Sequence, residues 1–426
     1  MDTTSLVNNL WLLLAALLVF TMTIAVGFLE VGELGEDLWP SLLKTTMISG
    51  SGLFFMALVG FNIAFAPTVL HGFIGNPVYT GAFLGGFDPS TSLSVWWSQG
   101  PSHGNTGLYL GTYFLFEVAF ATVTLALVGV VMLRKVKPEA FALYTIPYFV
   151  LIWNLPAAWI WNPEGWLASM GMVDFAGGLV VHGAAGAAGL AFLVQIWREE
   201  RARGLTESPQ TSIKMVPTWL TLAILLLWVG WFGFNPGSVL QLNAEVPVVV
   251  LTTFLAAATA FLSTMGCQYL MTRRDPGPLW AVNGILMGLI VITPLAGFVS
   301  PASAVVLGLL CGPLFIAGER YVARLTWCSD PVGLLPGHLL GGLFGVGMIA
   351  FFTQTQFATL SGAPTSLPNG LLFGGGMPAV HQLGIEMFGV VVVMATVFAL
   401  SFVAVWAIAK GLRGLTRPEL YRTPSG

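Results

Sequence analysis

Two stretches of the chain share the pattern that decides the fold: D-F-A-G-G-L-V-V-H-G-A-A-G-A-A-G at 174–189 and D-P-V-G-L-L-P-G-H-L-L-G-G-L-F-G at 330–345. In both, a His follows the Asp by eight residues, and glycines follow it by three, twelve and fifteen. Each stretch opens a long apolar segment, and the cation pattern below gives the two segments opposite directions across a membrane. The pattern indicates an inverted repeat, which places the substrate pathway between two halves near the bilayer midplane.

The composition indicates an all-α integral membrane protein. Of the 426 residues, 56% are hydrophobic and only 8% are charged, which is too little charge for the surface of a soluble protein of this length. Apolar segments of about 20 residues, long enough to cross a hydrocarbon core, recur along the chain. We predict eleven transmembrane helices, at 9–29, 42–65, 107–133, 139–161, 174–197, 215–235, 244–271, 278–298, 301–318, 332–352 and 378–409.

The sixteen Lys and Arg residues predict the orientation. Every one is assigned to a position after an odd-numbered span: Lys44; Arg134, Lys135 and Lys137; Arg198, Arg201, Arg203 and Lys214; Arg273 and Arg274; Arg320 and Arg324; Lys410, Arg413, Arg417 and Arg422. Loops rich in Lys and Arg stay cytoplasmic, so the N-terminus is predicted outside and the C-terminus inside. One span more or fewer would scatter the cations over both sides.

One membrane domain is predicted at 1–410, followed by a short cytoplasmic tail at 411–426. A repeat of five plus five spans leaves the eleventh helix outside the symmetry. The first span is expected to be retained, because the residues before it lack the basic region of a signal peptide. Trp96 and Trp97 lie in the long outer loop 66–106, which we interpret as an interfacial loop with an aromatic belt. The tail is either a docking segment or a solvated end.

His182 and His338 occupy matching positions of the repeat, so they should meet between the two halves. An imidazole in hydrocarbon is costly unless it faces the bundle interior and has a partner. Two in contact can relay a proton or hold a small polar solute. The alternative is that each only links neighbouring helices, but a symmetric pair favours a function. A haem site would need a wide pocket.

The glycines of the two histidine helices favour close helix packing, which argues against a cofactor and fits either a narrow pore or a tight interface with no pore. They are Gly177, Gly178, Gly183, Gly186, Gly189, Gly341, Gly342 and Gly345. Asp174 and Asp330 precede helical runs and are interpreted as helix caps. No H-E-x-x-H or paired-aspartate motif is present, which argues against an intramembrane enzyme or a metal site. The short basic clusters are explained by topology and predict no nucleic-acid partner.

The motif D-F-A-G-G-x-V-V-H from Asp174, G-W-F-G-F-N-P-G-S at 230–238 and A-V-N-G-I-L-M-G-L-I-V-I-T at 281–293 resemble the Amt/Mep/Rh ammonium transporter family, Amt branch. The resemblance runs from about the third span to the tail. It implies a homotrimer in the cytoplasmic membrane that conducts ammonium or ammonia, with methylammonium as a second substrate. It also implies a cytoplasmic regulator of the PII type as a partner.

The resemblance assigns roles to eight residues. The outer site that recruits ammonium matches Phe116, Trp161 and Ser238, and the stacked gate matches Phe120 and Phe234. The pore histidines match His182 and His338, and the supporting acid matches Asp174. Aromatic faces attract a small cation while the hydroxyl accepts one of its hydrogens. Carrying a bare cation through the membrane would cost on the order of tens of kcal/mol, so we expect ammonia to cross with its proton handed separately along the histidines.

The sequence departs from the family pattern at several places. Glu117 stands where a neutral Gln is usual, and we interpret it either as a second proton acceptor or as a partner for a neighbouring helix. Pro236 replaces a small residue, P-G-H-L at 336–339 replaces V-H-G, and the first inner loop, E-V-G-E-L-G-E-D at 30–37, lacks a basic cluster. An ammonium sensor with little flux is the alternative function.

Overall fold

The computed structural model describes residues 3–35, 37–79, 88–97, 107–132, 135–207, 215–417 and 421–422. Within these ranges, eleven helical segments are long and apolar enough to cross a membrane, which confirms the predicted number of spans. They are α1 (Thr3–Leu34), α2 with α3 (Leu38–Phe55, Phe61–Phe65), α4 (Leu110–Val130), α5 with α6 (Pro138–Pro147, Asn154–Ile160), α8 (Ala184–Arg203), α9 (Pro217–Gly237), α10 (Glu245–Thr272), α11 (Pro278–Ile292), α12 (Pro301–Val322), α13 (Leu340–Phe352) and α15 (Gly376–Gly411).

Four of these spans contain a π-helical turn, at Met56–Gly60, Tyr148–Ile152, Gly178–Gly183 and Leu335–Leu339. The remaining elements are short. They are the antiparallel pairs β1 (Thr68–Val69) with β2 (Ile74–Gly75) and β3 (Thr206–Glu207) with β4 (Tyr421–Arg422), the helices α7 (Trp166–Ser169) and α14 (Thr355–Leu360), and 3₁₀ turns at Leu93–Val95, Thr293–Leu295 and Leu371–Phe373.

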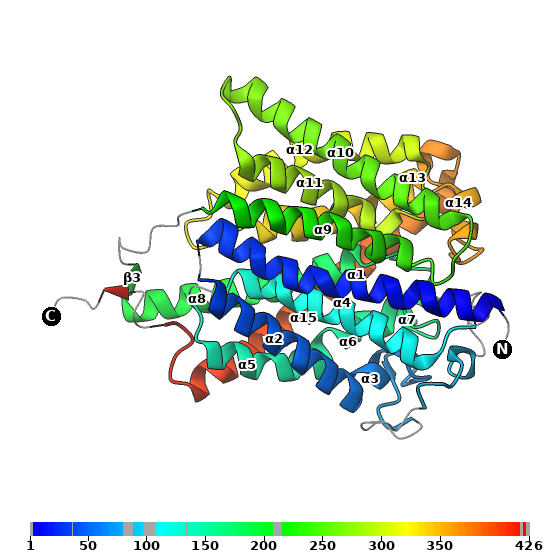
Figure 1. The fold of residues 1–426 in the computed structure, drawn as a ribbon, viewed down its shortest axis with the longest axis horizontal. Helices are drawn as coiled ribbons and strands as arrows, with labels where there is room; N and C mark the ends of the chain where they lie inside the picture. Colours follow the sequence, from blue (N-terminus) through cyan, green and yellow to red (C-terminus); the bar gives the residue numbers. More distant parts are fainter. Residues whose placement is uncertain are drawn as a thin grey trace.

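Helices α1 and α9, which open the two halves of the repeat, lie side by side at the centre of the molecule (Figure 1). Glycines of α9 permit this approach, because a β-carbon at Gly233 would collide with the carbonyl of Ala15 in α1. Helices α10, α11 and α12 lie on one side of this pair, and α2, α4 and α5 on the other (Figure 1). Large apolar side chains such as Leu17 and Leu262 are exposed, as expected for helices that contact lipid.

The two histidine helices contact each other reciprocally, as an inverted repeat requires. A β-carbon at Gly186 would collide with Leu339, and one at Gly342 would collide with the carbonyl of Gly178. Each of these glycines stands twelve residues after the Asp of its own repeat. The glycines three residues after each Asp also match in conformation, since Gly177 and Gly333 both have a positive φ, of 109° and 68°.

Helix α15 packs outside the repeat, against α8 and α5 (Figure 1). The Tyr144 hydroxyl is 2.8 Å from Ser401 Oγ, and Gln195 donates a hydrogen bond of 3.3 Å to the carbonyl of Phe402. The eleventh helix is therefore an addition to the five-plus-five core, as the repeat predicted.

The segment after α15 is docked, which decides between the two interpretations of the tail. Lys137 Nζ donates to the carbonyls of Leu412 and Gly414 at 3.2 and 2.9 Å. Glu199 at the end of α8 accepts from the Leu415 backbone N–H at 2.6 Å. Residues 418–420 and 423–426 lie outside the described residues.

Two interpretations of the sequence were wrong. Trp96 and Trp97 are each only 2% exposed and pack with Phe61, Phe65 and Tyr113, so they are core residues of the loop, not an interfacial belt.

The first inner loop is also shorter than expected. Helix α1 continues through Glu30 to Leu34, and Lys44 lies inside α2 rather than in the loop. The Lys44 ammonium and the Glu30 carboxylate form a buried ion pair, supported by a hydrogen bond of 3.0 Å from the Ser41 hydroxyl to Glu30. The two opposite charges can be buried between the helices because each is the counter-ion of the other.

Candidate functional site

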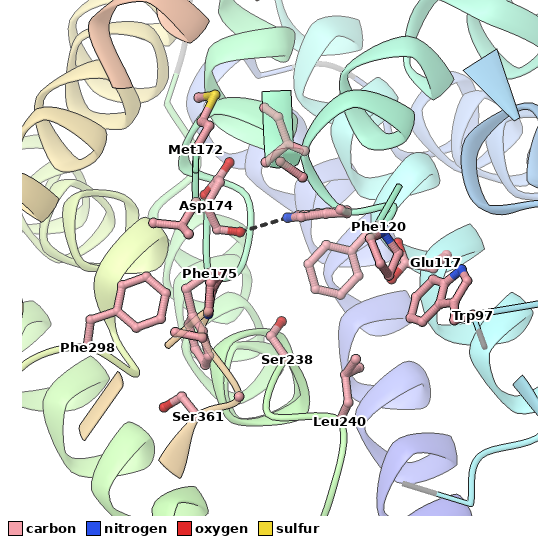
Figure 2. A pocket seen from close by; sticks show the side chains of 18 of the residues that line it. Trp97, Glu117, Phe120, Met172, Asp174, Phe175, Ser238, Leu240, Phe298 and Ser361 are labelled. Carbon is pink, nitrogen blue, oxygen red and sulfur yellow. Dashed lines mark hydrogen bonds between the residues drawn. The ribbon is translucent and has the colours of Figure 1, made fainter. Parts of the chain in front are cut away.

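A cavity of about 240 Å³ is lined by described residues from several helices, and we call it the vestibule. The predicted recruitment residues Phe116, Trp161 and Ser238 all line it, as do Glu117 and Asp174. In Figure 2, Glu117, Phe120 and Trp97 gather on one side of the vestibule, and Asp174, Phe175 and Phe298 lie on the other. The structure thus brings together side chains from α4, the end of α6, the end of α9 and the loop before α8.

Local contacts set the orientation of the three recruitment residues. Phe116 and Phe120 are one turn apart on α4, with ring centroids 4.8 Å apart. The indole nitrogen of Trp161 donates to the Asp174 carbonyl at 2.7 Å, which leaves the faces of the ring free to form a wall. The Ser238 hydroxyl donates to the carbonyl of Phe234 at 2.9 Å, so its lone pairs are available to accept a hydrogen bond.

The floor of the vestibule is closed by aromatic rings. The centroids of Phe120 and Phe234, the predicted gate, lie 4.4 Å apart, and the rings are inclined by 40°. Both side chains are buried. Trp161 meets Phe120 edge-on at 5.6 Å. Passage beyond this point therefore requires the rings to move.

The predicted histidine pair lies below the gate. The Nδ1 atoms of His182 and His338 are 3.1 Å apart, and both side chains are buried. One Nδ1 must carry a proton and the other must accept it, because a neutral imidazole donates from one nitrogen only. The His182 ring is nearly parallel to Phe234, at 5.8 Å and 12°, which continues the aromatic stack down from the gate.

Two small cavities adjoin the histidine pair. One, of about 10 Å³, is lined by both histidines, Phe234 and Trp231. The other, of about 20 Å³, lies between His338 and Asn283. Each has room for about one molecule of the size of water. The lining is otherwise largely aliphatic, so the passage suits a very small neutral solute.

Asp174 caps the helix that carries His182. Its carboxylate accepts from the backbone N–H groups of Gly177, Gly178, Leu179 and Val180 at 2.7–3.0 Å. Burial raises the pKa of Asp174, and the four N–H donors oppose that shift. Helix α8 with its π-helical turn thus begins at Gly178, four residues later than predicted.

Asp330 plays the same part in the second half. It accepts from the N–H groups of Leu334 and Leu335 at 3.1 and 2.8 Å. Both histidines then lie in a π-helical turn, which widens the helix locally and is frequent at functional sites.

Residues 10–417 match the model of the Ammonium Transporter Family. The chain belongs to the ammonium transporter family. It is a multi-pass membrane protein, as its eleven apolar helices require. The chain is 28% identical to the ammonium transporter of Bacillus subtilis over 407 residues, which cover 95% of the chain and 91% of that relative.

Solved structures with the same fold cover almost the whole of this family member. A structure described as a sensor Amt protein is 26% identical, with a TM-score of 0.79, and the match covers 98% of the chain and 96% of that structure. Mep2 of Saccharomyces cerevisiae is 25% identical with a TM-score of 0.79, over 99% of the chain and 88% of that structure.

Sequence reasoning missed three residues of this transporter-family site. Trp97 and Tyr113 line the vestibule, and Trp231 stacks on His182 at 5.9 Å and donates to Thr293 Oγ1 at 3.2 Å. Tyr113 lies one turn before Glu117, a spacing that could have been noticed. Trp97 comes from a loop distant in sequence, and nothing in the sequence signals its place in the site.

Proposed function

We propose that this protein transports ammonium, recruiting the cation in the vestibule and conducting ammonia past the histidine pair. Membership of the ammonium transporter family supports the cargo. The observation that carries the mechanism is the set of compartments: an aromatic vestibule, a closed pair of rings, and two single-molecule cavities beside two hydrogen-bonded imidazoles.

Recruitment uses Phe116, Trp161 and Ser238. The faces of the aromatic rings attract a cation, and the Ser238 hydroxyl accepts one of its N–H groups. Asp174 contributes through its charge, which the helix N-terminus holds in place and which adds to the negative field of the vestibule.

Deprotonation precedes passage through the gate formed by Phe120 and Phe234. The Born cost of moving an ammonium-sized ion into an apolar medium is on the order of 20 kcal/mol, and no anionic side chain lines the small cavities beside the histidines. Neutral ammonia avoids this cost. The proton that ammonium gives up passes to the histidine pair and moves separately through the His182–His338 hydrogen bond, so net transport carries charge.

The assembly and its surroundings follow the family resemblance. We propose a homotrimer in the cytoplasmic membrane, with the N-terminus and the vestibule outside and the tail inside, where a PII-type regulator would dock. The cation-rich segments 135–137 and 410–417 lie together at the tail end of the molecule, linked by the contacts of Lys137, which fits a cytoplasmic face.

An ammonium sensor is the second candidate. The match to a sensor Amt protein over almost the whole of both chains favours it, and the recruitment residues would serve a sensor equally well. Transport and sensing differ in flux, so a current measurement separates them.

The test is the current evoked by ammonium across liposomes that contain the purified protein, measured beside the variants His182→Ala and His338→Ala. His381→Ala is the matched control, because His381 is an exposed residue of α15 that lines neither the vestibule nor the small cavities. A saturable current that the control keeps and the two variants lose supports transport through the histidine pair. Tight ammonium binding without current would make the protein a sensor.

A further inference from the structure

The vestibule contains one carboxylate whose partners are incomplete. Glu117 is only 4% exposed and lines the cavity, on the side that it shares with Trp97 and Phe120 (Figure 2). The hydroxyl of Tyr113, one turn earlier on α4, interacts with this carboxyl group. The Oε2 atom has no hydrogen-bond partner among the described residues. Glu117 is therefore held by its own helix and leaves one oxygen unused.

The described residues that line the vestibule include no Lys or Arg that could neutralise Glu117. The sequence has no Lys or Arg between 45 and 133, between 138 and 197, between 215 and 272 or between 325 and 409. These stretches supply every described lining residue of the vestibule except Phe298, which comes from 275–319, a stretch that also has no Lys or Arg. A buried carboxylate without a counter-charge is strongly disfavoured, so any cation that pairs with Glu117 must enter from solution.

The structure also argues against the interpretation of Glu117 as a partner for a neighbouring helix. Its interaction with Tyr113 lies within α4, and Oε2 meets no donor from another helix among the described residues. A protonated Glu117 would need an acceptor for its own proton, which is not found at Oε2 either. A bound cation with N–H groups satisfies this oxygen and the charge together.

We propose that Glu117 is the counter-ion of the cation in the vestibule: ionised Glu117 accepts a hydrogen bond from bound ammonium at Oε2 while Tyr113 holds the carboxylate in place. This inference rests on the proposed function and adds to it a specificity element. The aromatic faces attract any small cation, whereas the carboxylate favours one that carries N–H donors, such as ammonium or methylammonium.

The experiment measures ammonium binding to the purified full-length protein through tryptophan fluorescence, since Trp97 and Trp161 line the vestibule. Ammonium chloride is titrated at constant ionic strength against Glu117→Gln, Glu117→Asp and Tyr113→Phe. Asp88→Asn is the matched control, because Asp88 is an exposed acid beside the start of α4 that does not line the vestibule. Its neighbour Pro89 accepts a backbone hydrogen bond from Gly111.

We expect Glu117→Gln to raise the Kd about tenfold or more, as for the loss of a charged hydrogen-bond partner, and Asp88→Asn to leave it unchanged. Glu117→Asp keeps the charge and should bind more tightly than Glu117→Gln, which separates charge from folding defects. Tyr113→Phe should lie between wild type and Glu117→Gln. Wild-type affinity should weaken on acidification, because protonation removes the Glu117 charge. That of Glu117→Gln should change less, since only Asp174 then remains as a carboxylate among the described lining residues.

A Kd of Glu117→Gln within about twofold of wild type, with the same pH profile, would overturn the inference. That result leaves the proposed function untouched, because wild-type current through the histidine pair decides the latter. Wild-type protein with neither current nor ammonium binding would instead remove the proposed function itself.

Discussion

The Nδ1 atoms of His182 and His338 lie 3.1 Å apart although 156 positions of sequence separate the two residues. Their helices come from the two halves of the repeat and cross where Gly342 lies against Gly178. Two imidazoles at this distance share one proton, and both cannot be charged without strong repulsion. The pair is therefore one hydrogen-bonded unit rather than two separate histidines.

A shared proton path predicts non-additive variants. His182→Ala and His338→Ala should each reduce the ammonium-evoked current by about tenfold or more, and the double variant should lose little beyond either single variant. Current from reconstituted liposomes provides the measurement, with His381→Ala as the control. Losses that multiply in the double variant would show that the two imidazoles act independently.

The crossing of the two histidine helices should not tolerate a side chain at Gly342. Its β-carbon would collide with the Gly178 carbonyl, so Gly342→Ala should destabilise the protein by about 1–3 kcal/mol. Gly347→Ala on the same helix is the control, because its β-carbon meets only Met387 Cε, at 3.5 Å. The thermal unfolding midpoint in detergent checks this, and equal midpoints for the two variants would contradict it.

The buried ion pair between Glu30 and Lys44 should be stabilising only as a pair. Either Glu30→Gln or Lys44→Met leaves a charge buried in the protein, which should cost about 3–5 kcal/mol. The double variant removes both charges and should recover much of the loss. A double-mutant cycle on thermal stability tests this, and additive effects would mean that the two side chains do not interact.

Removal of the Asp174 cap should lower stability and ammonium current more than removal of an exposed acidic side chain. Asp174→Ala removes the acceptor of four backbone N–H groups at once, so we expect a loss above about 2 kcal/mol together with lower ammonium current. Asp88→Asn, at an exposed turn, should change neither quantity. Wild-type stability of Asp174→Ala would show that the cap is dispensable.

Part of this architecture follows from the sequence because a membrane constrains it strongly. Backbone groups in hydrocarbon must be satisfied within each helix, so apolar segments of sufficient length predict all eleven spans, and the positions of Lys and Arg check their number. The repeated spacing of Asp, Gly and His then predicts that His182 and His338 meet. A resemblance of motifs was enough to name Phe116, Phe120, Trp161, Phe234 and Ser238 as residues of one pathway.

The tertiary structure alone decided the remaining features, because they depend on contacts between segments that share no repeated sequence pattern. Trp97 reaches the vestibule from a loop, and the structure turns it inward where composition favoured the membrane interface. Lys44 counts as a loop cation in the sequence, yet it is buried against Glu30. The partners of Glu117 could be known only after packing had shown Tyr113 as its neighbour and left Oε2 free. The sequence by itself determined the helices and their symmetry through local burial, whereas the chemistry of the vestibule was decided by side chains that packing alone brings together.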